Sequence, residues 1–281
     1  MKIFGEDRHS FVCADSALQK ILWVSEEGRV VRELDTGGYC FDMWVLPDDG
    51  VLYAHYGMGC DGVSAADEHG RIVFRYRAQG EVFGCQPLPN GRVLVGELRA
   101  KRLAVITPEG RLEEEIPLDY DGEPHECMRM PRRVTDGYLV VQPGSRSIVR
   151  LDRNGRRIRS FQTRADAFGV VEKDDGHVLY TCLEGAFELD GEGREVWSLT
   201  SADVPEIHLY WLLGLQLRPN GHVVLSNWLG HGHRGEGVPF FEVDRSKRVV
   251  WYCDCRNELL EPACIQILDE DRALTCSRPY R

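Results

Sequence analysis

The sequence predicts an all-β fold, a six-bladed β-propeller, and three observations carry this prediction. Segments of one hairpin shape recur six times along the 281 residues, and a second hairpin series alternates with them. In the second series, turn glycines are 41, 46, 39 and 45 residues apart, at Gly50, Gly91, Gly137, Gly176 and Gly221. No long segment shows the apolar i, i+3, i+4, i+7 pattern of a helix. Two hairpins per repeat of about this length are typical of four-stranded antiparallel propeller blades.

The first hairpin series supplies the two outer strands of each predicted blade. Each member has an apolar stretch, a polar turn that often contains Asp and Gly, and a second apolar stretch. The six members are residues 21–34, 63–76, 103–116, 148–161, 186–199 and 240–253. Five of the turns contain a glycine, and Lys247 stands at that place in the sixth. The repeated turn predicts six equivalent tight hairpins.

The second hairpin series supplies the two inner strands. Its members are residues 44–55, 86–97, 132–142, 170–182, 215–227 and 265–276. Asp-Gly and Asn-Gly pairs provide the positive φ angles that tight hairpin turns need. The strand centres at 93–95 and 223–225 are apolar on both faces. Such strands fit a sheet that is packed between two neighbouring sheets.

The two ends of the chain are predicted to close the ring within a single domain, residues 1–281. The chain begins with the strands 11–15 and 20–24 and ends on 263–268 and 272–276. A blade built from both ends would leave no open sheet edge. Segments 11–15 and 272–276 compete for the same place, so the sequence leaves open whether one or two closing strands come from the C-terminus.

Composition narrows the range of partners and the cellular location. The formal net charge of −11 lacks the basic excess of nucleic-acid-binding proteins. No segment approaches the ~18 apolar residues of a membrane span. The N-terminal segment has no apolar stretch of a signal peptide, so we expect a cytoplasmic protein with unpaired cysteines. The Cys253-x-Cys255 pair has no second ligand pair at zinc-site spacing.

The outer hairpins carry a recognisable pattern, an Asp-x-x-Gly-type turn with an aromatic residue seven positions after the Asp. The three matching pairs are Asp67 and Phe74, Asp190 and Trp197, and Asp244 and Trp251. This pattern resembles the quinoprotein-like (PQQ-like) β-propeller repeat. The other three units depart from it, with Arg32, Glu114 and Arg159 at the aromatic place. The resemblance implies the fold alone, and because the chain has no recognisable PQQ ligand set, we predict no bound PQQ.

The repeat also predicts where a site would lie. Tight turns within the two hairpin series share one face, and the longer connections share the other, which we call the irregular face. Binding residues often lie on variable loops held by a rigid scaffold. The longest unit separates Gly193 from Lys247 by 54 residues, against 38 to 45 elsewhere, and it contains the Gly-rich loop 227–240. We therefore predict a pocket over the axis on the irregular face.

Residues of these loops form the predicted site. The predicted catalytic residues are His231, His233 and His125, because histidine transfers protons near neutral pH. The predicted ligand-binding residues are Asp42, His55, Arg99, Glu126, Trp211, Asn227 and Trp228. Aromatic faces pack on sugar C–H groups, and polar side chains take hydroxyls. Arg99 is expected to pair with a carboxylate.

These residues predict a small polar ligand, carbohydrate- or uronate-like, with catalysis possible on it. The alternative is a non-catalytic module, either a ligand sensor or a platform for a protein partner. No metal cofactor is predicted, although His231 and His233 with His125 or Glu126 would suit Zn²⁺ or Mn²⁺. No nucleophile-elbow, P-loop or dinucleotide-binding motif is present.

Overall fold

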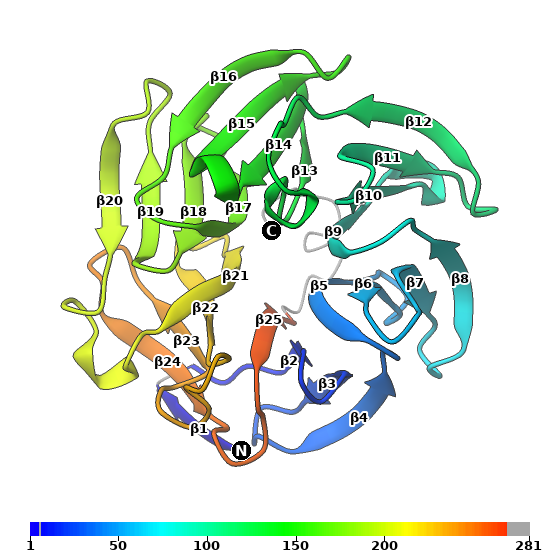
Figure 1. Ribbon diagram of the computed structural model, residues 1–281. Coiled ribbons are helices and arrows are strands. Elements are labelled where there is room, and N and C mark those ends of the chain that lie inside the picture. Colours follow the sequence, from blue (N-terminus) through cyan, green and yellow to red (C-terminus); the bar gives the residue numbers. More distant parts are fainter. Residues whose placement is uncertain (6, 269–281) are drawn as a thin grey trace.

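Six sheets surround a central axis in the computed structural model, which describes residues 1–5 and 7–268 (Figure 1). Each sheet is one antiparallel blade that extends from an inner strand beside the axis to an outer strand at the rim. The helical elements of these residues are four short 3-10 helices, among them η2 (Pro124–Glu126) and η4 (Pro205–Ile207). The predicted fold class, a six-bladed propeller, is confirmed.

Four blades follow the chain in simple order. Blade 2 contains β5 (Tyr39–Val45), β6 (Val51–Tyr56), β7 (Gly62–Ala66) and β8 (Ile72–Arg77). Blade 3 contains β9 (Val82–Pro87), β10 (Val93–Glu97), β11 (Arg102–Ile106) and β12 (Leu112–Pro117). Blade 4 contains β13 (Arg132–Val134), β14 (Gly137–Gln142), β15 (Ser147–Asp152) and β16 (Arg157–Gln162). Blade 5 contains β17 (Ala167–Glu172), β18 (Val178–Cys182), β19 (Gly185–Leu189) and β20 (Glu195–Leu199).

The remaining two blades join the two ends of the chain. Blade 6 contains β21 (Trp211–Leu217), β22 (Val223–Trp228), β23 (Phe240–Val243) and β24 (Val249–Asp254), with β1 (Lys2–Gly5) as a fifth strand. Blade 1 contains β25 (Pro262–Ile267), β2 (Phe11–Asp15), β3 (Lys20–Val24) and β4 (Val30–Asp35). Strand β25 is innermost and pairs with β2, so the segment 11–15 takes the contested place. The competing segment 272–276 lies outside the described residues.

Strand β1 is an addition that the sequence analysis did not anticipate. It pairs antiparallel with the rim strand β24, with Ile3 opposite Cys253. The N-terminal ammonium group anchors it further, donating to the Gly28 carbonyl at 3.1 Å and pairing with Glu258 at 3.2 Å. Blade 6 therefore has five strands rather than four, and the chain ends join the ring at two sheets.

The outer hairpin turns owe their shape to one side chain each. In four of them an Asp carboxylate accepts hydrogen bonds from the backbone N–H groups two and four residues later. These residues are Asp67, Asp152, Asp190 and Asp244. The turn then needs a left-handed residue, which is glycine in five blades and Lys247 (φ 68°) in the sixth. The recurring pattern thus reflects local turn chemistry.

Apolar layers between the blades hold the ring together. The indole of Trp251 is fully buried between blades 6 and 1 and meets the Phe11 ring edge-on at 5.7 Å. Of the nine cysteines in the described residues, all but Cys60 are buried. Burial raises the pKa of the Cys13 and Cys40 thiols, which act as small apolar groups. No helix in the described residues is both long and apolar enough to cross a membrane.

Candidate functional site

A cavity of about 320 Å³ lies over the axis, and we call it the axial cavity; its side chains come from blades 2, 3, 5 and 6 and from the connections that lead into blades 4 and 1. It is lined by Tyr39, Phe41, Tyr56, Phe83, His125, Arg129, Phe168, Trp211, Leu213, Trp228, His231 and Glu261. Several of these residues belong to the longer connections, which places the cavity on the irregular face. Figure 1 looks along the axis around which the inner strands are arranged.

Irregularities at the start of inner strands aim several of these side chains at the axis. The pairing register shifts around Phe41 in β5, Phe83 in β9, Phe168 in β17 and Leu213 in β21. A bulge of this kind re-aims a side chain out of the regular alternation. Except after Phe41, a glycine follows, and a Cβ at Gly84 would lie 2.5 Å from Pro131 Cδ of the next blade. The glycines therefore allow close packing of the inner strands.

The three bulged phenylalanines, together with Trp211 and Trp228, give the axial cavity an aromatic lining. The Phe41 ring lies 5.2 Å from Phe83, 5.8 Å from Phe168 and 6.3 Å from Trp228, measured between ring centroids. The Trp211 ring meets Trp228 edge-on at 5.8 Å. Aromatic side chains on one cavity offer flat apolar faces to a ring-shaped ligand.

Arg129 brings a positive charge into this aromatic surface. Its guanidinium centre lies 4.6 Å from the Phe83 ring centroid and 5.9 Å from that of Phe168. The Nη1 group donates to the carbonyls of His125 and Met128. Burial lowers the pKa of Arg129, but an arginine stays protonated in proteins. Arg129 is only 9% exposed and forms no ion pair within the described part of the chain.

The acidic groups at the cavity already have partners. Glu261 accepts from Arg234 at 2.7 Å and from the Ser16 hydroxyl at 3.2 Å. His125 Nδ1 lies 2.8 Å from Glu81 Oε2. The buried indole N–H of Trp211, in contrast, has no acceptor among the described residues. Among the described residues, the cavity thus presents one unsatisfied donor, the Trp211 N–H, and one cation, Arg129, that has no direct ion-pair partner.

Four of the ten predicted site residues line the axial cavity: His125, Trp211, Trp228 and His231. The His231 ring meets Trp228 edge-on at 4.9 Å, and its backbone is left-handed at φ 52°. His125 is carried by the short helix η2 just before the first strand of blade 4. The loops that the sequence analysis singled out therefore do supply part of the cavity.

Two other predicted residues organise the Gly-rich loop instead of lining the cavity. His233 stacks on Tyr210 at 3.8 Å and pairs with Glu236 at 2.7 Å. Asn227 is fully buried, where its carboxamide accepts from Tyr210 N and donates to the carbonyls of His208 and Val238. Asn227 therefore ties the loop after β22 to the segment before β21.

The last four predicted residues lie elsewhere. Asp42 is buried, and its two oxygens accept from Arg132 Nη1 and Nη2 at 2.8 and 3.1 Å. Cys85 N of the intervening blade 3 also donates to Asp42. His55 lines a different cavity, between blades 1 and 2. Arg99 and Glu126 are exposed and do not line the axial cavity.

Candidate metal ligands gather at two other places in the described residues. The groups are Asp7, His9 and Glu242, and Asp175, His177 and Glu188. Each buried carboxylate already has a cation nearby, Arg218 at 3.3 Å from Glu242 and Lys173 at 2.8 Å from Glu188. Burial opposes ionisation of Glu242, but its hydrogen bond to His9 and the charge of Arg218 lower its pKa. These ion pairs satisfy the carboxylates without a metal.

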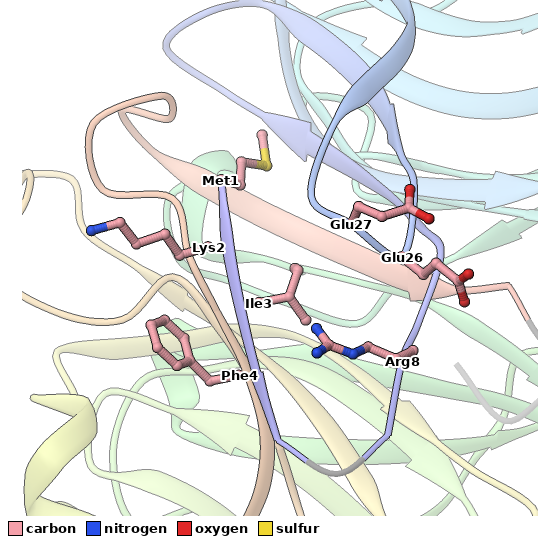
Figure 2. A pocket seen from close by; sticks show the side chains of 7 residues that line it. All are labelled: Met1, Lys2, Ile3, Phe4, Arg8, Glu26 and Glu27. Atoms are coloured by element: carbon pink, nitrogen blue, oxygen red, sulfur yellow. The ribbon is translucent and has the colours of Figure 1, made fainter.

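A third hollow, of about 640 Å³, runs beside the N-terminal strand β1 (Figure 2). Lys2 and Phe4 point to one side of the strand, and Ile3 points to the other, toward Arg8 (Figure 2). This groove beside β1 is lined by residues 1–4, 8 and 26–27 and has four charged side chains, those of Lys2, Arg8, Glu26 and Glu27.

Comparisons with known proteins bear on the fold. No family model matches the chain, and no curated protein matches its sequence. A protein of unknown function from Bacteroides caccae superposes with TM-score 0.81 at 20% identity, covering 94% of this chain and all of that one. A streptogramin B lyase gives TM-score 0.63 at 12% identity, covering 89% of this chain and 86% of that one. A chain of a nidogen/laminin complex gives 0.65 at 11%, covering 92% and 97%. These likenesses support a propeller fold without singling out the PQQ-like repeat.

Proposed function

We propose that the protein binds a small organic anion in the axial cavity and that Arg129 holds its carboxylate or an equivalent group. Arg129 carries this proposal, because its guanidinium is buried among aromatic rings without a carboxylate partner in the described chain. An uncompensated buried charge is costly, and an anionic ligand would remove that cost. Guanidinium groups bind carboxylates through two parallel hydrogen bonds.

The rest of the cavity suggests what accompanies the anionic group. Phe83 and Trp228 offer ring faces, and the Trp211 indole N–H offers a donor. A sugar ring or a planar ring bearing a carboxylate would use both features. The uronate-like ligand expected from the sequence belongs to this class, with Arg129 taking the carboxylate role that the sequence analysis gave to Arg99.

Binding can be tested with matched ligand pairs. Uronates and neutral sugars of the same ring configuration, together with aromatic carboxylates, are screened by thermal shift and then by calorimetry. A bound ligand raises the melting temperature of the native state. We expect anions to bind and Arg129→Gln to weaken them about 10- to 100-fold, since a hydrogen bond to a charged group contributes roughly 1.5–3 kcal/mol.

The matched control is Arg99→Gln, because Arg99 is exposed outside the cavity and should leave affinity unchanged. Equal affinity of wild type and Arg129→Gln for every anion would contradict the proposal. If no small molecule binds, the alternative from the sequence, a platform for a protein partner, becomes the better account.

Proton transfer is a second candidate function, favoured by the His125–Glu81 pair. A carboxylate at the Nδ1 side fixes the orientation of an imidazole, as in acid–base dyads. The Phe83 and His125 rings meet in a T-shaped contact with 5.4 Å between their centroids, and Arg129 lies over the Phe83 ring. A ligand carboxylate on Arg129 would therefore place neighbouring C–H groups near His125.

The corresponding reaction removes a proton from the carbon next to the carboxylate. The C–H bond breaks, its electron pair stays on the carbon as an enolate, and Nε2 of His125 takes the proton. Proton NMR in D₂O measures the resulting exchange without knowledge of the full reaction. We expect His125→Gln to slow exchange by roughly 100-fold or more while the dissociation constant stays within a few-fold. Absence of exchange with a bound ligand would leave a binding or sensing role.

A further inference from the structure

A cavity of about 350 Å³ lies between blades 1 and 2 and shares no lining residue with the axial cavity; we call it the interblade cavity. One wall is residues 35–37 at the end of β4, and the other comes from β6, β7, β8 and residues 59–61. Four buried polar side chains line it, namely Thr36, Tyr53, His55 and Ser64, at 5%, 2%, 5% and 1% exposure.

The hydroxyl of Ser64 stands where other blades have apolar side chains. Tyr53 is the third residue of β6 and lies opposite Ser64 of β7. The corresponding pairs in blades 3, 5 and 6 are Val95 with Ala104, Tyr180 with Phe187 and Leu225 with Phe241. Packing between blades therefore does not require a hydroxyl at this position.

The hydrogen bonds of His55 fix its tautomer. Its Nδ1 is hydrogen-bonded to the Cys60 carbonyl, which can only accept, so Nδ1 carries the proton. Nε2 therefore presents a lone pair to Ser64 Oγ at 2.9 Å, and the Ser64 hydroxyl is the donor. A serine that donates to an imidazole held by a third group has the arrangement of an activated nucleophile.

The buried surroundings of His55 favour a neutral imidazole. Burial lowers the pKa of His55, the backbone of Cys60 opposes this, Arg75 lowers the pKa further and Asp61 raises it. Burial also raises the pKa of Tyr53 to about 12, so its phenol stays protonated. The other ionisable groups that line the cavity are Asp35, Cys60, Tyr76 and Arg77. The neutral form of His55 is the one that can accept a proton.

Arg75 supplies a positive charge beside the serine. It lies directly opposite Ser64 in the β7–β8 pairing, so the two side chains project from the same face of the sheet. It lines the cavity and forms no ion pair with the described residues. A cation at this place could stabilise negative charge that develops on a carbonyl oxygen.

We propose that Ser64 is a nucleophile and that the interblade cavity accepts acyl groups from small esters. Ser64 Oγ forms a bond to the ester carbonyl carbon while its proton passes to His55 Nε2, and Arg75 faces the oxyanion. The carbon–alkoxide bond then breaks, and the departing alkoxide takes the proton from His55. Water, with His55 again as base, cleaves the acyl-serine, so acid and serine are released and no other co-reactant is needed.

A fluorophosphonate probe tests this on the full chain, because Ser64 Oγ would form a bond to phosphorus as fluoride leaves. The adduct is located by peptide mass spectrometry. We expect one adduct per chain, on Ser64, lost in Ser64→Ala and formed about 100-fold more slowly in His55→Gln. The labelling rate of wild type should fall with pH along a single ionisation below ~6.5, the ordinary pKa of histidine.

Two controls separate this site from other effects. Ser226→Ala removes another buried β-strand serine, whose hydroxyl donates to the Pro262 carbonyl, and should not change labelling. Arg129→Gln should not change it either, because the axial cavity is separate. Folded wild type with no adduct on Ser64 would overturn the proposal, as would labelling that His55→Gln leaves undiminished. If His55→Gln does not fold, the pH profile of wild type decides, and a flat profile contradicts the role of His55.

Discussion

Arg129 and Arg132 are three positions apart and both are buried, but their side chains have different partners. Arg132 is buried and satisfied by Asp42, which reaches it from blade 2 across blade 3. Arg129 is buried too, but its charge faces aromatic rings in the axial cavity. The first pair links three blades near the axis, whereas Arg129 forms no ion pair within the described residues and is the group that we propose to bind an anion. Nothing in the local sequence distinguishes them.

The Asp42–Arg132 pair should be a large contributor to stability. Asp42→Asn breaks the buried ion pair between Asp42 and Arg132, and breaking a buried ion pair typically lowers the free energy of unfolding by ~3–5 kcal/mol. Urea denaturation monitored by tryptophan fluorescence measures the change. The control is Asp166→Asn, which removes the exposed partner of Arg146 and should cost less than ~1 kcal/mol. A similarly small decrease in the free energy of unfolding in both variants would show that Asp42 does not contribute substantially to stability.

Residues that line the axial cavity were predictable from sequence where they lie on or beside the long connections. His125, His231, Trp211 and Trp228 were selected because these connections on one face are rich in polar and aromatic residues, and all four line the cavity. Phe41, Phe83 and Phe168 were missed because they lie inside strands that read as core. The dipeptides Phe83-Gly84 and Phe168-Gly169, each near the start of an inner strand, were the available signal. Arg129 was not predicted because its proposed role depends on the lack of an ion-pair partner among the described residues. Only the folded structure shows this.

At the scale of elements, the hairpins were predictable because their turns are encoded locally. The Asp244 carboxylate, for example, shapes its turn through hydrogen bonds within four residues. Closure of the ring by both chain ends was also predicted. Which segments pair, such as Phe11 with Ile267, depends on contacts between the chain ends that no local pattern records. The same applies to β1, a short strand whose place is set by the free edge of β24.

Closure by β25 should be essential to the whole ring. Deleting residues 262–281 removes the innermost strand of blade 1 and opens an inner sheet edge, so we expect loss of cooperative thermal unfolding or aggregation. Deleting residues 1–5 removes only the rim strand β1 and should lower the melting temperature while leaving unfolding cooperative. Calorimetry on both truncations makes the comparison. A cooperative, wild-type-like transition in the first truncation would contradict this closure.

At the scale of the whole molecule, the ring makes one cavity from many repeats. No blade could form the axial cavity alone, because its lining residues come from four blades and from two connections between blades, between positions 39 and 261 of the chain. The interblade cavity, in contrast, needs only blades 1 and 2. Likeness to other propellers at 11–20% identity supports the architecture and leaves the chemistry of both cavities to their own residues.

The most direct test of the axial site is a crystal structure of the protein with the tightest-binding carboxylate from the ligand screen. The account predicts density over the axis, with carboxylate oxygens within hydrogen-bond distance of Arg129 and the ligand ring against Phe83 or Trp228. Ligand density only on the tight-turn face or in the groove beside β1, with nothing bound near the Arg129 side chain, would contradict the proposal.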